Sequence, residues 1–139
     1  MEGPRQVNPG FQASLGIGDM IVMVVEDEEH TALMLQDLIG REVFSIQWSA
    51  TLRDARQMLV WMNPDLIILD RNLPDGDGAE LCRELKLDVK TQSIPVLFLT
   101  GRPTDPSKSG GDDYLPKPFT APELLRRAQR LLRGRGGTP

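Results

Sequence analysis

The sequence predicts a doubly wound α/β domain, in which helices cover both faces of a five-stranded parallel sheet. From Met20 onward, short apolar runs alternate with amphipathic stretches, which is the pattern of strands buried between two helical layers. The chain has 139 residues, of which 40% are apolar, and this is enough for one domain with one sizeable core. The sequence therefore predicts one domain, not two.

Five apolar runs are the expected strands of this sheet. They lie at residues 21–25, 44–48, 66–69 and 96–99, with a short fifth run at 114–115. Between these runs, apolar residues recur every three or four positions, so each intervening segment can form a helix with one apolar stripe. Two of these stripes are Ala32, Leu35, Leu38 and Ile39, and Leu52, Ala55, Leu59 and Met62.

Polar residues and glycine mark the ends of two helices. Thr51 followed by Asp54, and Thr120 followed by Glu123, resemble capping boxes, whose side chains bond free N–H groups in the first helical turn. The last helix is expected to end at Gly134, where a glycine-rich tail begins.

The domain is expected to cover residues 20–133. Residues 1–19 mix glycine, proline and polar residues without a helical or strand period, which favours a flexible N-terminal extension. Residues 134–139 are expected to form a flexible C-terminal tail.

Charge, cysteine content and hydropathy exclude several functions. A net charge of −4 gives no general attraction to nucleic acid, so direct binding is not expected. Cys82 is the only cysteine, which excludes an intrachain disulfide or a cysteine-based metal cluster and favours a cytoplasmic location. No run approaches the roughly 18 apolar residues of a membrane span, so no membrane partner is expected. Cys82, Trp48 and Trp61 fall on apolar faces and are expected to be structural.

Polar side chains follow four of the five predicted strands. Glu26 and Asp27 follow the first strand, Asp70 the third, Thr100 the fourth and Lys117 the short fifth. The carboxyl ends of parallel strands meet at one edge of the sheet, where open α/β sheets bind their ligands. We therefore expect these side chains to form one site.

Three carboxylates at one edge would repel one another unless a cation neutralised them. Mg²⁺ is suited to this, because it prefers oxygen ligands and commonly binds one or two carboxylates together with phosphate oxygens. Asp27 and Asp70 are the expected direct ligands. Asp70 could then attack a phosphorus atom as a nucleophile, while the metal, a lysine and a hydroxyl offset the charge on the phosphoryl oxygens.

Four segments of the chain resemble, in order and nearly in spacing, the signature of the receiver domains of two-component response regulators. They are IVMVVEDEE, PDLIILDRNLPDGDG, VLFLTG and DDYLPKPF. The resemblance covers about residues 20–133 and implies a flavodoxin-like fold with strand order 2-1-3-4-5. It also implies a phosphoacceptor signalling domain, not an enzyme, that catalyses only its own phosphorylation and dephosphorylation.

The same resemblance implies a role for each acidic residue. Asp70 would accept the phosphoryl group, and Asp27 would bind Mg²⁺ directly. Glu26 would help to hold the metal, partly through water, and the backbone carbonyl of Asn72 would supply a further ligand. The phosphoryl donor would be a sensor histidine kinase or a histidine phosphotransfer protein, and phosphorylation would switch partner interactions, with homodimerisation among them.

Three further residues match the signature. Thr100 and Lys117 would each bond a phosphoryl oxygen. Tyr114 would be the switch aromatic, which turns inward when Thr100 moves toward the phosphoryl group. The Lys117–Pro118 peptide bond is expected to be cis, an isomer that costs little before proline.

One segment departs from the family pattern. From Thr100 to Lys117 the chain is about five positions shorter than usual, a deficit of about one and a half helical turns. The intervening residues include several prolines and glycines and almost no apolar side chain. We predict that the fourth helix is shortened or absent, and that phosphorylation reorders residues 101–112 or exposes another face, because family members usually signal through that helix.

Three alternatives remain at this point. A pseudo-receiver would keep the fold and signal without phosphorylation, although Asp70, Thr100 and Lys117 are all present. A phosphatase of the haloacid dehalogenase type also uses a nucleophilic aspartate, but usually has a second acidic residue two positions later, where this chain has Asn72. A DNA-binding regulator would need an output domain that this sequence does not contain.

Overall fold

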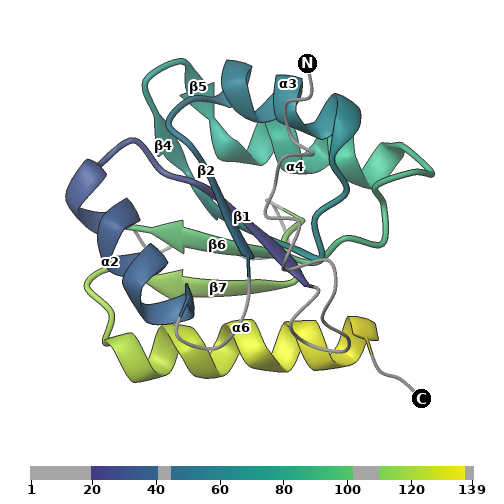
Figure 1. The fold of residues 1–139 in the computed structure, drawn as a ribbon. Coiled ribbons are helices and arrows are strands. Elements are labelled where there is room, and N and C mark those ends of the chain that lie inside the picture. Colours follow the sequence, from purple (N-terminus) through teal and green to yellow (C-terminus); the bar gives the residue numbers. More distant parts are fainter. Residues whose placement is uncertain (1–19, 41–44, 102–109, 137–139) are drawn as a thin grey trace.

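A five-stranded parallel sheet lies between two layers of helices in the computed structural model, which describes residues 20–40, 45–101 and 110–136 (Figure 1). The strand order is β2-β1-β3-β6-β7. Numbered along the chain within this sheet, it is the predicted order 2-1-3-4-5, which is confirmed. The strands are β1 (Ile21–Val25), β2 (Ser45–Ser49), β3 (Leu66–Asp70), β6 (Val96–Thr100) and β7 (Asp113–Pro116).

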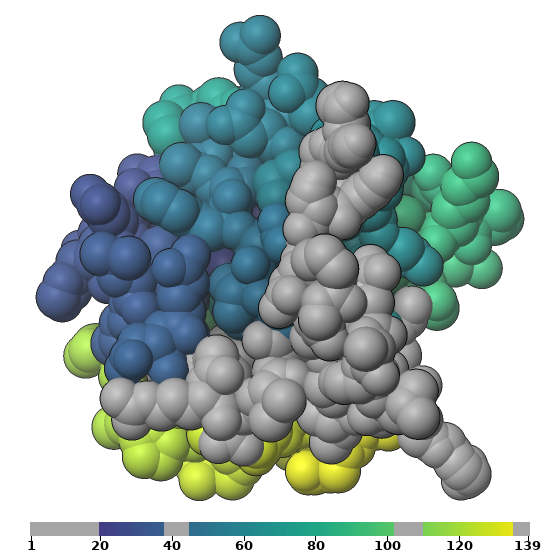
Figure 2. Space-filling view, viewed as in Figure 1, coloured from purple at the N-terminus to yellow at the C-terminus, as the bar shows by residue number. Residues whose placement is uncertain are grey.

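The helices divide between the two faces of the sheet. On one face, α2 (Glu29–Gly40) and α6 (Ala121–Gly136) pack against alternate strand residues such as Val24 and Leu97. On the other face, α3 (Leu52–Trp61) and α4 (Gly78–Leu87) pack against the intervening residues, such as Met23 and Phe98. Helix α6 forms the lower edge of the molecule in Figure 2. The prediction of helices on both faces is therefore confirmed.

Two helices begin at the predicted caps. The Thr51 hydroxyl accepts a hydrogen bond from the Asp54 N–H at 3.0 Å, and the Thr120 hydroxyl accepts one from Glu123 N–H at 3.3 Å. The prediction that the last helix ends at Gly134 is wrong, because α6 continues to Gly136. Gly134 weakens a helix without terminating it when the backbone keeps helical dihedral angles.

The expectation that Trp61 is structural is wrong. Its side chain is 53% exposed, whereas Cys82 is fully buried. Trp61 lies two positions after Leu59, and at about 100° per residue this places it on nearly the opposite side of α3 from the apolar stripe. Trp48 is half-buried, and its indole N–H donates to the Glu26 carbonyl at 2.7 Å.

Several expectations concern residues outside the described part of the chain. They are the flexible extension at 1–19, the end of the tail at 137–139, and most of the segment in which the fourth helix was predicted to be lost, 102–109. The described residues form four helices, α2, α3, α4 and α6. The last of them, α6, is the helix that the sequence predicted at the end of the domain, and it is distinct from the one predicted to be lost. Among the described residues, the helices are all too short or too polar to cross a bilayer.

A small hairpin directly follows β3 and was not predicted. Its antiparallel strands are β4 (Asn72–Leu73) and β5 (Gly76–Asp77). The turn between them contains Pro74 and Asp75, followed by Gly76, and such a Pro-Asp-Gly sequence is a turn signal that could have revealed the hairpin. This hairpin links the carboxyl end of β3 to the start of α4.

Candidate functional site

Three carboxylates meet at the carboxyl ends of β1 and β3. Glu26 and Asp27 follow β1, and Asp70 is the last residue of β3. The two strands are neighbours, with Val25 opposite Leu69. One carboxylate oxygen from each acidic residue lies within 4.8 Å of the others. The structure thus brings together the three acidic residues that the sequence placed at this edge.

Glu26 is a buried carboxyl group whose pKa is shifted. Its side chain is buried, with 1% of the residue exposed. Burial, together with the nearby charge of Asp70, raises the pKa of Glu26 from 4.5 to about 7. The Glu28 N–H donates to Glu26 Oε2 at 3.1 Å and partly opposes this rise. The Glu26 carboxyl group, with its pKa near 7, therefore resists ionisation below neutral pH.

Lys117 supplies a positive charge beside two of the carboxylates. Its Nζ lies 3.0 Å from Asp70 Oδ2 and 3.4 Å from Glu26 Oε1. Burial alone would lower the pKa of Lys117, but the hydrogen bond and charge of Asp70, with the charge of Glu26, outweigh burial and raise it. The Lys117–Pro118 peptide bond is cis, as the resemblance implies. Lys117 is therefore a charged ammonium at this site.

The backbone after β3 holds Asp70 from the other side. The Asn72 N–H donates to Asp70 Oδ1 at 3.1 Å, so each carboxylate oxygen has one protein donor. The first residue of α4, Gly78, approaches so closely that a Cβ there would lie 2.3 Å from the Asp70 carbonyl oxygen. Sequence reasoning missed Gly78, although its place in the Gly-Asp-Gly sequence is a signal for tight packing.

Thr100 and Tyr114 lie on the neighbouring strands β6 and β7, with Thr100 in register with Pro116 and Tyr114 in register with Phe98. Thr100 is buried at the end of β6, the strand next to β3, and its carbonyl accepts from the Lys117 N–H at 2.7 Å. Tyr114 lies on β7, and its ring stacks on Phe98 with centroids 5.3 Å apart. The Tyr114 hydroxyl accepts from the Gly111 N–H at 3.1 Å. The Tyr114 ring therefore packs against the core on the α3 and α4 face of the sheet.

A second ion pair, which sequence reasoning also missed, follows Asp70 directly. Arg71 Nε and Nη2 donate to the two oxygens of Asp77 at 2.8 and 2.9 Å. The same Asp77 carboxylate accepts from the Ala79 N–H at 2.9 Å and so caps α4. This pair holds the hairpin closed between Asp70 and α4.

The donor set at this site fits a divalent cation. Glu26, Asp27 and Asp70 offer only carboxylate oxygens, which are hard ligands of the kind that Mg²⁺ prefers. Lys117 contacts two of the three, and one ammonium does not balance three carboxylates. Burial and, after it, the charge of Asp70 raise the pKa of Glu26 despite the nearby ammonium. A divalent cation would offset the remaining negative charge.

Comparison with known proteins gives the family. Residues 22–129 match the family model described as response regulator receiver domain. The chain belongs to this family. The match favours the receiver interpretation over the alternative of a haloacid dehalogenase-type phosphatase. Receiver domains are signalling domains that carry an acidic site for Mg²⁺.

Two curated relatives are similar to this receiver domain. The phosphate regulon transcriptional regulatory protein PhoB of Rhizobium meliloti is 37% identical over 117 residues, which cover 81% of this chain and 52% of PhoB. Response regulator MprA of Mycolicibacterium vanbaalenii is 33% identical over the same length, covering 50% of MprA. The receiver domain thus spans about half the length of the curated relatives that it matches.

Solved structures agree with the family and the fold. The receiver domain of a signal transduction histidine kinase from Syntrophus aciditrophicus is 32% identical, with a TM-score of 0.79 over 86% of this chain and 95% of that chain. A response regulator from Chloroflexus aurantiacus is 29% identical, with a TM-score of 0.76 over 81% of this chain and 97% of that chain.

Proposed function

We propose that Asp70 accepts a phosphoryl group from the phosphohistidine of a sensor histidine kinase or a histidine phosphotransfer protein. The observation that carries the proposal is the 3.0 Å contact between Lys117 Nζ and Asp70 Oδ2, beside the carboxylates of Glu26 and Asp27. This arrangement combines a nucleophile, a fixed positive charge and a set of oxygen ligands. A surface aspartate that only capped a strand would need neither a buried lysine contact nor two further acids.

In the proposed reaction, a carboxylate oxygen of Asp70 forms a bond to phosphorus. The bond between phosphorus and the donor imidazole nitrogen breaks, and its electron pair stays on that nitrogen. The product is an aspartyl phosphate on Asp70 and an unphosphorylated histidine on the donor. The ammonium of Lys117 and the hydroxyl of Thr100 would each bond a phosphoryl oxygen, so both would stabilise the transferred group.

Glu26, Asp27 and Asp70, with the backbone carbonyl of Asn72, would hold Mg²⁺. When bound, the ion supplies positive charge that offsets the charge on the phosphoryl oxygens. The Glu28 N–H donates a hydrogen bond to Glu26 Oε2 at 3.1 Å and so orients the Glu26 carboxylate. The Asn72 N–H likewise orients Asp70 through Oδ1.

Phosphorylation would act as a switch of partner interactions, and the domain would serve as a phosphoacceptor with no other substrate. Thr100 and Tyr114 are the proposed switch residues, because Thr100 ends the strand beside Asp70 and Tyr114 lies on the next strand, β7. Movement of Thr100 toward the phosphoryl group would alter the packing of Tyr114 on Phe98 and its bond to Gly111. A cytoplasmic location stays a prediction from the sequence.

The proposal is tested by intact-mass measurement after incubation with acetyl phosphate and Mg²⁺. The wild-type chain should gain the mass of one phosphate, and Asp70→Asn should gain none. Equal labelling of both proteins would move the site elsewhere. No labelling of either, with acetyl phosphate and with a kinase donor, would instead support the pseudo-receiver, a binding module that works without phosphorylation.

A further inference from the structure

The backbone that follows Asp70 lies beside the acidic site, since the Asn72 N–H donates to Asp70 Oδ1 at 3.1 Å. Between these two residues, the Arg71 N–H donates to the Leu99 carbonyl of β6 at 3.1 Å. The Arg71 carbonyl accepts from the Gly78 N–H of α4 at 2.8 Å. The peptide units on both sides of Arg71 are therefore tied to β6 and to the start of α4.

The Arg71 side chain closes the hairpin that continues this backbone. In the pairing of β4 with β5, Asn72 lies opposite Asp77. Arg71 Nε and Nη2 donate to the two Asp77 oxygens at 2.8 and 2.9 Å, and such a fork of two bonds fixes the orientation of both groups. Hydrogen bonding within the pair raises the pKa of Arg71 and lowers that of Asp77, so both groups are charged. The ion pair therefore holds the two strands of the hairpin together at the level of Asn72.

A further contact limits the movement of the guanidinium. Its central carbon lies over the Phe98 ring, 5.9 Å from the ring centroid, which is within the range of a cation–π interaction. Phe98 is fully buried on β6, and only 23% of the Arg71 side chain is exposed, against 46% for Asp77. Arg71 thus connects the hairpin to the core of the sheet.

Asp77 has two roles that a substitution can separate. Its carboxylate pairs with Arg71, and its Oδ1 accepts from the Ala79 N–H at 2.9 Å, which caps α4. Capping needs only a side-chain oxygen, and asparagine is about as good a helix cap as aspartate. The ion pair needs the negative charge and both oxygens. Asp77→Asn therefore keeps the cap and breaks the bidentate ion pair.

We infer that Arg71, through its ion pair with Asp77, is a positioning residue that sets the Mg²⁺ affinity of the acidic site. The inference rests on the proposed function, which assigns the Asp70 carboxylate and the Asn72 carbonyl to the ion. Mg²⁺ demands close to ideal octahedral geometry, so a shift of one backbone ligand weakens its binding. Arg71 acts through Asn72 and is not itself a ligand, because a guanidinium has donors and no acceptor.

The sign of the effect distinguishes positioning from a simple charge effect. Removing the positive charge of Arg71 makes the surroundings of the site more negative, so Coulomb attraction alone would tighten Mg²⁺ binding. Removing the negative charge of Asp77 would weaken it on the same ground. If the pair positions the Asn72 backbone, both substitutions weaken binding. Substituting both residues then weakens binding no more than either substitution alone, because the same contact is lost.

Calorimetric titration of the full chain with Mg²⁺ tests the inference. Arg71→Met and Asp77→Asn should each raise the dissociation constant about tenfold or more, which is the usual effect of losing a group that orients a metal ligand. The double variant should match the weaker-binding single variant. Arg71→Lys keeps the charge and loses the fork, so it should also weaken binding, and it provides a second test should Arg71→Met fold poorly.

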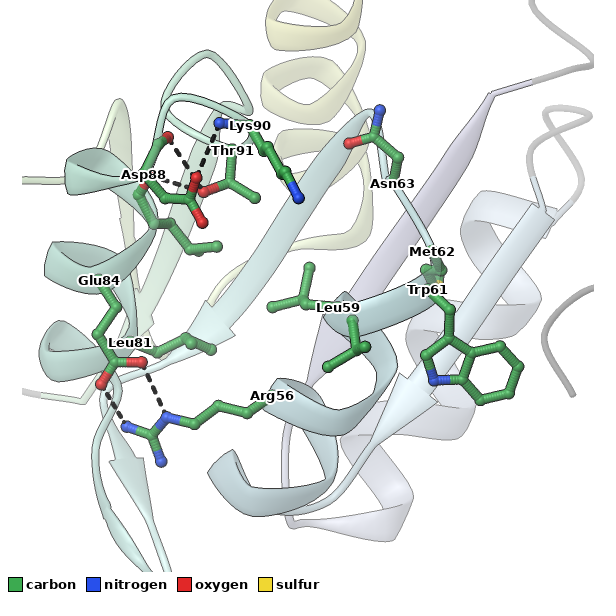
Figure 3. A pocket seen from close by; sticks show the side chains of 12 residues that line it. Arg56, Leu59, Trp61, Met62, Asn63, Leu81, Glu84, Asp88, Lys90 and Thr91 are labelled. Carbon is green, nitrogen blue, oxygen red and sulfur yellow. Dashed lines mark hydrogen bonds and ion pairs between the residues drawn. The ribbon is translucent and has the colours of Figure 1, made fainter.

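A second bidentate ion pair of the chain supplies the matched control. Arg56 of α3 reaches Glu84 of α4, and its Nε and Nη2 donate to the two carboxylate oxygens at 2.9 and 2.8 Å (Figure 3). This pair has the same geometry as the Arg71–Asp77 pair but includes no residue of the acidic site or of the hairpin. Arg56→Met and Glu84→Gln should leave the dissociation constant within about twofold of wild type, whatever their effect on the free energy of unfolding.

Three results would overturn the inference. They are unchanged or tighter Mg²⁺ binding by Arg71→Met, additive losses in the double variant, and equal weakening by Arg56→Met. Intact mass after treatment with acetyl phosphate is measured on the same preparations. A wild-type chain that gains no phosphate, although the variants shift Mg²⁺ affinity as expected, would refute only the proposed phosphoryl transfer. A normal phosphate gain with equal Mg²⁺ affinity in all variants would refute only this inference.

Discussion

Lys117 bonds Asp70 across 47 positions of sequence, with Nζ 3.0 Å from Oδ2. The same ammonium lies 3.4 Å from Glu26 Oε1, so one cation connects residues at the ends of two neighbouring strands. The site is therefore organised by the ends of β1 and β3 and by the segment after β7.

Removing this ammonium should slow phosphorylation. We expect Lys117→Met to lower the rate of labelling by acetyl phosphate about 100- to 1,000-fold, because one of the groups that stabilise the transferred phosphoryl group is lost. The rate is measured by intact mass over time in saturating Mg²⁺. Lys86→Met is the control, since the Lys86 side chain is 26% exposed against 27% for Lys117 and pairs with Asp112, outside the site. A similar loss in both variants would contradict the assignment.

The buried Glu26 should make the metal-free protein less stable as pH rises. Its pKa is about 7 in the folded chain, against an ordinary 4.5 when exposed. Between these values the folded chain holds a proton that the unfolded chain has lost, so this stability is complete below pH 4.5 and is lost as pH approaches 7. The free energy of unfolding should fall by about 1 to 3 kcal/mol across this range. Urea unfolding at several pH values measures it, and Glu26→Gln should flatten the slope. An equal slope in that variant would show that another group is responsible.

Mg²⁺ should stabilise the folded chain, because the ion binds carboxylates that only folding brings together. At a concentration roughly 100 times the dissociation constant, the gain is about 2.7 kcal/mol. Asp27→Asn should remove most of it, as judged by thermal unfolding with and without the ion. Asp54→Asn changes another exposed aspartate outside the cluster and should keep the full Mg²⁺ response. If Asp27→Asn kept it too, Asp27 would not be a ligand.

Substituting Gly78 should strain the connection between Asp70 and α4. A Cβ at this position would lie 2.3 Å from the Asp70 carbonyl oxygen, which is backbone and cannot rotate away. We expect Gly78→Ala to lower the free energy of unfolding by about 1–3 kcal/mol. Gly134→Ala is the contrasting variant, because it meets open space within α6 and should stabilise the chain by about 0.5–1 kcal/mol. Denaturant unfolding compares the two, and a neutral Gly78→Ala would argue against the close approach.

The strands and the acidic site could be predicted because their signals are local. Apolar runs such as 66–69 end in a polar residue, and parallel strands place their carboxyl ends at one edge. That rule alone predicts that Glu26, Asp70 and Lys117 lie at one site. The residue-by-residue roles still depend on the family resemblance, since the spacing alone does not distinguish a nucleophile from a strand cap.

Other features could not be read in the same way. The hairpin after β3 is too short to show a period, and its contacts run from Asp75 to Leu52, 23 positions earlier. Trp61 was misjudged because an apolar residue at a helix end can face either the sheet or solvent. Its position two residues after Leu59, on the far side of α3 from the apolar stripe, is the signal that could have shown its exposure.

By itself, the sequence determined that this chain forms a parallel α/β domain with Asp70, Glu26 and Lys117 at one sheet edge, because its short apolar runs alternate with amphipathic stretches and end in polar residues. Only the tertiary structure decided that the segment after Asp70 caps both α3 and α4, through Asp75 and Asp77. Such contacts join residues far apart in the chain, and their existence depends on how the helices pack.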